Sequence, residues 1–200
     1  MEEIGTIEDK YNEEFQDNHT QSIILKEKDG ITISRTFEGK YDINFEMTQF
    51  LHMPSFIDFS MFKIIMDLNE DIFETSNIDI ISNNEAVITV NFKQYLSDLG
   101  IQSLNQCLRI IKMHEVIDGE IRKTVFHINT IVNDNNLIAE TLQNSSFVEC
   151  TFLTNNTVSI NINQSTTNDI ILPFAERMGV NVSGKIISRL KQFIENMGNI

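Results

Sequence analysis

Apolar and polar residues alternate in short runs along most of this 200-residue chain, and this alternation constrains the fold more than any other feature. Successive side chains of a strand point to opposite faces of a sheet, so a period of two predicts strands with one buried face. The runs 30–37 and 41–47 both show this pattern. We therefore expect an antiparallel meander that buries one of its faces.

Short turn sequences separate the alternating runs. They are Asp29-Gly30, Glu38-Gly39, Ser82-Asn83-Asn84-Glu85, Asp118-Gly119 and Asn155-Asn156. Gly and Asn tolerate positive φ, which tight hairpin turns require. The predicted strands are 22–28, 30–37, 41–47, 77–81, 86–92, 107–116, 120–129, 147–153 and 157–163. The fold class is α+β, mostly antiparallel sheet with a few short helices.

Helical spacing of apolar residues predicts three helices. The first is Ser60–Asn69, capped by Asp58 or Ser60, and the second is Asn133–Asn144, capped near Asn133 or Asp134. The third, Ser183–Met197, is amphipathic and takes Ser183 as its cap. Its apolar stripe is Ile186, Ile187, Leu190, Phe193 and Ile194, opposite Lys185, Arg189 and Lys191.

The formal net charge of −14 limits the partners of this chain. Such a protein repels phosphate backbones and anionic membranes at long range, so a nucleic-acid role needs a local basic surface. Seven acids and one lysine lie within residues 1–20, which we interpret as a mobile leader or one frayed helix. The folded part is therefore less acidic than the total charge implies.

The N-terminus has no signal-peptide pattern, and no run approaches the ~18 apolar residues that span a bilayer. Cys107 and Cys150 have neither metal nor redox spacing; two buried thiols in a reducing compartment fit this pair better than one disulfide. We expect an intracellular protein, cytoplasmic or nuclear, that is not secreted and carries no membrane anchor.

Motifs for catalysis, cofactors and metals are missing. No Gly-x-Gly and no Gly-x-Ser-x-Gly occurs. His114 and His127 could face each other across a hairpin, but strand histidines of this kind are more often exposed or hydrogen-bonded than metal ligands. Residues 67–71 begin like a calcium loop, but Ile72 stands where Gly is required. We predict a binding protein, not an enzyme, with no cofactor and no metal.

A stretch rich in Phe and Met before and within the first predicted helix has two interpretations. It is the core side of that helix, or it lines a pocket or a partner groove with adaptable side chains. Its members are Phe50, Met53, Phe56, Phe59, Met61, Phe62 and Met66.

Two parts of the chain resemble each other. Residues 80–92 and 152–163 share a pattern of apolar pair, Asn-Asn turn and alternating strand, and a hairpin and a helix precede each. The predicted order strand–strand–helix–strand–strand thus occurs twice, near residues 22–92 and 107–163. Duplication and a shared bias toward Ile and Asn both explain the match.

With this repeat, the chain resembles DNA sliding clamps of the proliferating-cell-nuclear-antigen, checkpoint-clamp and phage-clamp types. The resemblance rests on Ser22–Lys26, Gly30–Arg35 and Tyr41–Phe45 as strands, on Ile57–Leu68 as a helix, and on Asn77–Ile81 with Val87–Phe92 as its hairpin. It implies repeated helix-plus-strands units: a leader (1–20), a first unit (21–92), a connector (93–106), a second unit (107–171) and a C-terminal helix (172–200).

The resemblance also implies a function in DNA replication and repair, as a processivity factor that contacts other protein subunits and forms a homo-oligomer. Candidates for duplex DNA contact are Lys63, Lys185, Arg189 and Lys191. Candidates for partner binding in the connector are Tyr95, Leu96, Leu99 and Ile101. Against it, the two internal helices carry few basic residues, and the chain ends in a helix where a clamp ends in a strand.

The C-terminal helix favours an alternative. The order of a strand, a helical region at 54–68, further strands and the helix 183–197 resembles the helix-grip fold of START-related proteins. That resemblance implies that the sheet wraps the last helix over a cavity for a lipid or other apolar ligand. A third hypothesis is a structural or regulatory subunit of a larger assembly.

Overall fold

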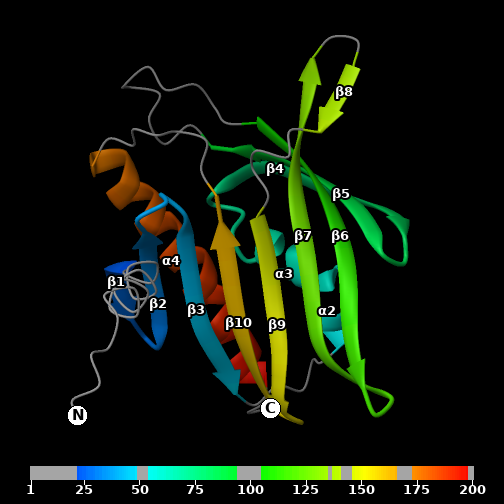
Figure 1. The fold of residues 1–200 in the computed structure, drawn as a ribbon. Helices are drawn as coiled ribbons and strands as arrows, with labels where there is room; N and C mark the ends of the chain where they lie inside the picture. The colour runs from blue at the N-terminus through cyan, green and yellow to red at the C-terminus, as the bar shows by residue number, and fades with distance from the viewer. Residues whose placement is uncertain are drawn as a thin grey trace, which may run out of the picture.

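The computed structural model describes residues 22–48, 54–93, 105–134, 137–140, 146–165 and 173–197. Within them, one antiparallel sheet runs in the order β1-β2-β3-β10-β9-β7-β6-β5-β4, and β8 pairs with β7 off this path (Figure 1). The strands are β1 Ser22–Lys28, β2 Ile31–Thr36, β3 Tyr41–Thr48, β4 Phe73–Ser82, β5 Glu85–Phe92, β6 Asn105–Ile117, β7 Glu120–Asp134, β8 Leu137–Glu140, β9 Ser146–Thr154 and β10 Thr157–Gln164. The helices are α2 Pro54–Ile57, α3 Ser60–Asp67 and α4 Pro173–Met197.

Two of the predicted turns have the backbone that their residues favour. Asp29 and Gly30 have φ of 54° and 71°, and Asp118 and Gly119 have φ of 54° and 81°. Positive φ at both central residues is the type I′ geometry, whose twist matches that of the adjoining strands. These turns fix the registers of the β1–β2 and β6–β7 hairpins, so the period-two pattern becomes a two-faced sheet.

One row of buried side chains crosses five strands on the inner face of this sheet. Ile31 of β2 is paired with Phe45 of β3, which is paired with Ile160 of β10. Ile160 is paired with Cys150 of β9, and Cys150 with Thr124 of β7. Because all five are buried, the inner face continues across strands that are distant in sequence.

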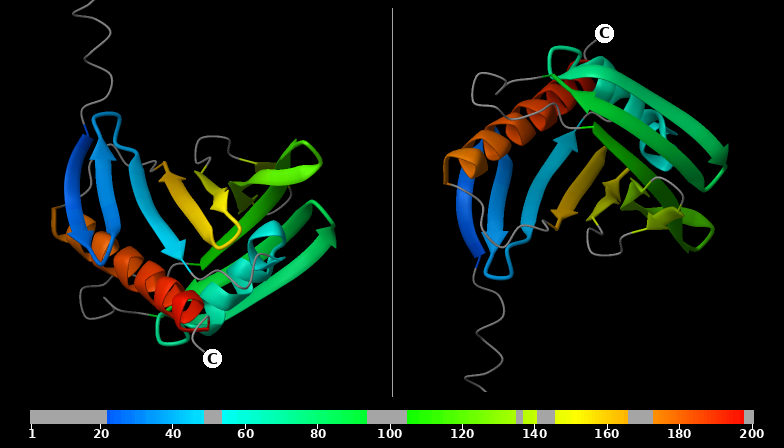
Figure 2. Two further views of the ribbon diagram at one scale, coloured as in Figure 1. Left: turned by 90° about the horizontal axis from the view of Figure 1, so that it is seen from below. Right: turned by 90° about the horizontal axis from the view of Figure 1, so that it is seen from above.

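The sheet is curved, and α4 lies on its concave side (Figure 2). It packs over β2 and β3 and reaches α3 near its C-terminal end. The face of α4 that meets the sheet buries Val180, Ile187, Leu190 and Ile194. A fully buried side chain of this size stabilises the fold by about 1.5–3 kcal/mol relative to an exposed one.

The Phe- and Met-rich stretch is core where the structure describes its side chains. Phe56, Phe59, Met61 and Met66 are all buried. The ring of Phe126 on β7 lies 6.1 Å from that of Phe59 and 5.2 Å from that of Phe62, centroid to centroid. Of the two interpretations of this stretch, the core one is therefore correct for these residues.

The second predicted helix, 133–144, is wrong. β7 continues to Asp134, and β8 pairs Leu137–Glu140 with Ile131–Asp134 of β7. The β-branched residues 130–132 favour extended backbone, and the neighbouring strand supplies the hydrogen bonds that a helix would have made internally. Without this helix, the second strand–strand–helix–strand–strand unit does not exist. The predicted clamp-like repeat is therefore wrong as well.

The predicted start of the last helix is also wrong. The helix begins ten residues earlier, at Pro173, and Ser183 lies in its interior. Pro is favoured in a first helical turn because it has no N–H that would need an internal partner. The longer α4 places Glu176 and Val180 over the sheet.

The packing of α4 predicts a large difference between two Leu→Ala substitutions. Leu190 on α4 is 1% exposed, and Leu153 at the end of β9 is 49% exposed. We expect Leu190→Ala to lower the free energy of unfolding by about 2–5 kcal/mol and Leu153→Ala by less than about 1 kcal/mol. Urea denaturation followed by circular dichroism measures both; equal losses would show that α4 is not part of the core.

Candidate functional site

A hollow of about 220 Å³ lies between the N-terminal half of α4 and the sheet. Ile33 and Ile43, a cross-strand pair of β2 and β3, provide apolar wall on the sheet side. The hollow is lined by Ile33, Tyr41, Ile43, Gln164, Ala175, Glu176, Gly179, Val180 and Ser183.

Small residues on α4 leave this space open. A Cβ atom added to Gly179 would have no neighbour within 4 Å, so nothing in the structure fills the volume that a side chain here would take. Ala175, one turn earlier, is the other small residue in the lining. Because both residues line the hollow, a bulky side chain at either position can narrow it.

Two residues of the lining, Tyr41 and Glu176, form a polar cluster with Arg35. Glu176 of α4 accepts hydrogen bonds from Arg35 Nη1 at 2.6 Å and from Tyr41 OH at 2.8 Å. The Glu176 side chain is 16% exposed, so its charge is compensated by the Arg35 guanidinium in a partly dry setting. Burial raises the pKa of Tyr41, and its hydrogen bond to Glu176 raises it further. Tyr41 is therefore held as a neutral donor.

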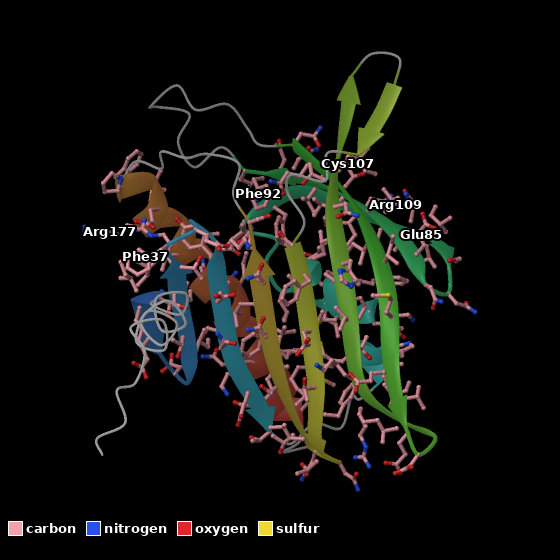
Figure 3. The ribbon with its side chains drawn as sticks, in the orientation of Figure 1. Phe37, Glu85, Phe92, Cys107, Arg109 and Arg177 are labelled. Carbon is pink, nitrogen blue, oxygen red and sulfur yellow. The ribbon has the colours of Figure 1, made fainter. Side chains whose placement is uncertain are left out.

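Two further hollows lie on the other side of α4, against the edge strand β1. One, of about 400 Å³, is lined by Ile24, Leu25, Lys26, Pro173, Glu176, Arg177, Val180 and Asn181. The other, of about 260 Å³, is lined by Lys26, Lys28, Asp29, Ile31, Asn181, Gly184, Lys185, Ser188 and Arg189. Figure 3 shows Phe37 and Arg177 at the end of the molecule where α4 begins. Glu85 of β5 and Cys107 and Arg109 of β6 lie at the opposite side.

The polar groups of the inner face near β6 and β7 are engaged with neighbours. Lys112 is buried with its Nζ 5.1 Å from the centroid of the Phe59 ring, a cation–π distance. His114 Nδ1 lies 3.0 Å from Thr124 Oγ1, and burial lowers the pKa of this histidine. Burial also raises the pKa of the Cys150 thiol, which disfavours the reactive thiolate.

His114 and His127 do not face each other, an arrangement that the sequence allowed but did not favour. His114 is paired with Thr124, and His127 with Ile111, so the two rings lie on opposite faces of the sheet. In the described residues no group of three His, Cys, Asp or Glu side chains could hold a metal ion. Cys107 and Cys150 are both free thiols. None of the helices in the described ranges is long and apolar enough to cross a bilayer.

The residues predicted to contact DNA lie on two separate surfaces. Lys63 is exposed on α3. Lys185 Nζ lies 2.7 Å from Asp71 Oδ2, and Arg189 binds the same carboxylate as well as Asn69 Oδ1 at 3.1 Å. Lys191 Nζ donates to the carbonyl of Glu46 and lies 3.0 Å from Glu195 Oε1. The connector candidates Tyr95, Leu96, Leu99 and Ile101 lie outside the described residues, as does the leader 1–20.

The cluster of Arg35, Tyr41 and Glu176 was not predicted. Glu176 lies 141 residues from Arg35 and 135 from Tyr41, so no local pattern links them. One signal was available, because Arg35 follows Ile31 and Ile33 at a period of two and so points to the inner face. A cation on an apolar face needs a partner, and the sequence does not say which acid supplies it.

No protein-family model and no curated protein matches the sequence. The structure is similar to the human StarD13 (DLC2) lipid transfer and protein localization domain, with a TM-score of 0.61 and 6% identity over 96% of this chain and 98% of that one. It is also similar to a STAR-related lipid transfer protein from Xanthomonas axonopodis (TM-score 0.58, 10% identity, 86% and 98% covered). Human StAR-related lipid transfer protein 5 gives a TM-score of 0.57 at 10% identity, with 94% and 93% covered.

These similarities correct the interpretation of the chain as a DNA sliding clamp. At such low identities they show the fold alone, and that fold is the helix-grip arrangement of a curved antiparallel sheet around a C-terminal helix. The resemblance to clamps and the role in DNA replication and repair that it implied are wrong. The error has a physical origin: hairpins beside a short helix suit both folds, and the helix wrongly predicted at 133–144 completed a repeat that the structure lacks.

The polar cluster predicts a shift in the titration of Tyr41. We expect Glu176→Gln to lower the pKa of Tyr41, because the variant removes the negative charge that disfavours the tyrosinate. Tyrosinate absorbance measures the titration, and Tyr41→Phe identifies the transition among the three tyrosines of the chain. An unchanged Tyr41 transition in Glu176→Gln would contradict the cluster.

The same cluster predicts a pH dependence of stability. The pKa of Tyr41 is raised on folding, so its contribution is complete below the ordinary value of 10.0 and is lost as the pH rises through the folded value. We expect the free energy of unfolding to fall more steeply above pH 10 in the wild type than in Tyr41→Phe.

Proposed function

We propose that this protein binds an apolar or amphipathic small molecule of the lipid class between α4 and the concave face of the sheet. The observation that carries the proposal is the hollow under α4, which has apolar walls and a hydrogen-bonded polar cluster beside them. Ligand pockets typically combine an apolar lining with a few polar groups that orient the ligand.

The size and chemistry of the hollow limit the ligand. Its volume of about 220 Å³ is below the ~300–1,000 Å³ of pockets for drug-sized molecules. It suits a small apolar molecule or one end of a larger lipid. Gln164 and Ser183 in the lining, with the neutral hydroxyl of Tyr41, suit a ligand with a hydroxyl or carbonyl group near that end. Lipid transfer, named for the structurally similar proteins, is in keeping with this chemistry.

The proposed role is binding without catalysis. The charged groups beside the hollow, Arg35 and Glu176, bind each other. A general acid or base needs a perturbed group that is available to the substrate, and this pair is committed to its ion pair. We propose neither duplex DNA nor a ring of subunits as a partner.

Contacts with other protein subunits remain part of the proposal, supported by one surface feature. β4 is the edge strand of the sheet at the end opposite β1. It exposes Ile80 and Ile81, at 66% and 61%. An edge strand with exposed apolar residues can accept a strand from another chain.

Filling the hollow tests the proposed function. We expect Gly179→Phe to weaken the binding of a fluorescent fatty-acid probe by at least about tenfold, since a factor of ten needs the lost burial of only about two methylene groups. The free energy of unfolding should hold or rise, because replacing a helical glycine removes a cost of up to about 1 kcal/mol. Fluorescence titration and urea denaturation measure the two quantities.

Gln192→Phe is the matched control, because Gln192 is exposed on α4 and does not line the hollow. It should bind the probe as the wild type does. Failure of the wild-type protein to bind the probe and to retain lipid in native mass spectrometry would refute the proposal, as would equal binding by Gly179→Phe and wild type.

A further inference from the structure

A groove runs along α4 on the side that faces β1. The two hollows of about 400 Å³ and 260 Å³ share Lys26 and Asn181 in their linings, so they adjoin each other along the helix. The first has apolar wall from Ile24, Leu25 and Val180. The second lies further along α4, beside the turn between β1 and β2. The groove therefore leads from a partly apolar end to a charged end.

The charged end of the groove is locally positive, although the protein as a whole is negatively charged. In a chain of net charge −14, the 260 Å³ hollow is lined by Lys26, Lys28, Lys185 and Arg189 against Asp29 alone. Cations gathered in a concave surface focus the local field and raise the concentration of anions there. At this hollow the local positive potential can attract an anion, even though the net charge of the protein is negative.

Two of these cations have weak partners. Lys26 Nζ donates to the neutral amide oxygen of Asn181 at 3.2 Å, and none of the described carboxylates forms an ion pair with it. Lys28 Nζ lies 4.0 Å from Asp29 Oδ2, with both side chains mostly exposed. An exposed pair at this distance contributes little, so both ammonium groups keep most of their capacity to bind an anion.

The other two cations, Lys185 and Arg189, are held in place by a carboxylate that does not line the hollow. Asp71, after α3, binds Lys185 and Arg189, whose hydrogen bonds hold the pKa of Asp71 well below its ordinary value. Arg189 also donates to the carbonyl of Leu68 at 3.3 Å. With Asp71 included, four cations still face two carboxylates. The site is therefore preorganised without being neutralised.

Lys26 occupies a position that depends on a glycine. A Cβ atom on Gly184 would lie 2.9 Å from Lys26 Nζ and 3.3 Å from its Cε. The ammonium group thus sits directly against the backbone of α4, where any larger residue would displace it. This close approach brings a β1 cation beside Lys185 and Arg189 of the helix.

We propose that this end of the groove binds a phosphate group, carried by a phospholipid headgroup or by a soluble phosphate ester. Several N–H donors of Lys and Arg around one hollow match a tetrahedral anion with multiple acceptor oxygens. Ser188 and Asn181 add neutral groups that can contact the ester. The apolar end of the groove can hold the part of an amphipathic molecule that follows the phosphate. The 260 Å³ hollow that would hold the phosphate shares no lining residue with the hollow beside β3, so this site does not depend on the ligand proposed there.

Calorimetric titration of the full chain with glycerol 3-phosphate at low salt tests the site, together with sedimentation of phosphatidylcholine vesicles with and without phosphatidic acid. We expect saturable binding of at least one probe, weakened by added salt. Binding of glycerol 3-phosphate identifies a soluble phosphate ester as sufficient. Binding only to vesicles with phosphatidic acid identifies the lipid headgroup. Binding of neither probe overturns the proposal.

Three variants separate a built site from general electrostatic attraction. Lys26→Gln should weaken binding about tenfold, the equivalent of one charge-assisted hydrogen bond. Gly184→Ala should weaken it by a smaller factor without changing the net charge, because the added methyl group makes the flexible end of the Lys26 side chain shift. Lys63→Gln removes the same charge as Lys26→Gln from an exposed site on α3 and should bind within about twofold of wild type.

Equal binding by wild type, Lys26→Gln and Gly184→Ala overturns the proposal, as does an equal loss in Lys63→Gln. If Gly184→Ala fails to fold, Lys26→Gln and Lys28→Gln, at a half-buried and an exposed position of β1, decide the matter. Gly179→Phe should bind phosphate as the wild type does, so the outcome here is independent of the test of the hollow beside β3.

Discussion

The structure depends on the packing of one apolar face of α4 across the concave side of the sheet. Val180, Ile187, Leu190 and Ile194 lose contact with water only because the sheet curves around them. Without the helix, the inner faces of β2 and β3 would be exposed to solvent. The same contact creates the two proposed binding surfaces, because a helix lying against a curved sheet leaves a space along each of its sides. The hollow beside β3 and the groove beside β1 are these two spaces.

Polar contacts at the two ends of α4 set its position over the sheet. Near its start, Glu176 is bound by Arg35 and Tyr41 of β2 and β3. Towards its end, Arg189 is bound by Asn69 and Asp71 after α3. A largely buried charge without a partner is costly, so the contacts of Glu176 penalise sliding or rotation of the helix. The Arg189–Asp71 pair is more exposed and adds less energy. Hydrophobic burial supplies most of the stability, and the polar contacts make one position of α4 better than its neighbours.

The distribution of charge explains how the two proposed binding surfaces of one acidic protein differ. Beside β3 the ionisable groups bind each other, which leaves an apolar hollow with a neutral hydroxyl. Beside β1 the cations outnumber the carboxylates, and Lys26 and Lys28 have only weak partners. The net charge of −14 describes neither place, because electrostatic interactions at contact distance depend on local partners and are screened over about 10 Å at ordinary salt.

The sequence alone determined the described strands except β8, most of the turns, the first predicted helix and the amphipathic character of the last one. These follow from periodicity and turn chemistry, which act between residues close in the chain, as at Asp118-Gly119. Residues 133–144 were misassigned because a short apolar run suits either a helix or a strand until a neighbour such as β7 is present. Only the tertiary structure decided that α4 lies inside the sheet, that Glu176 binds Arg35, and that Lys26 meets Gly184. Each of these contacts joins residues more than 130 positions apart, and no local pattern specifies a partner at that distance.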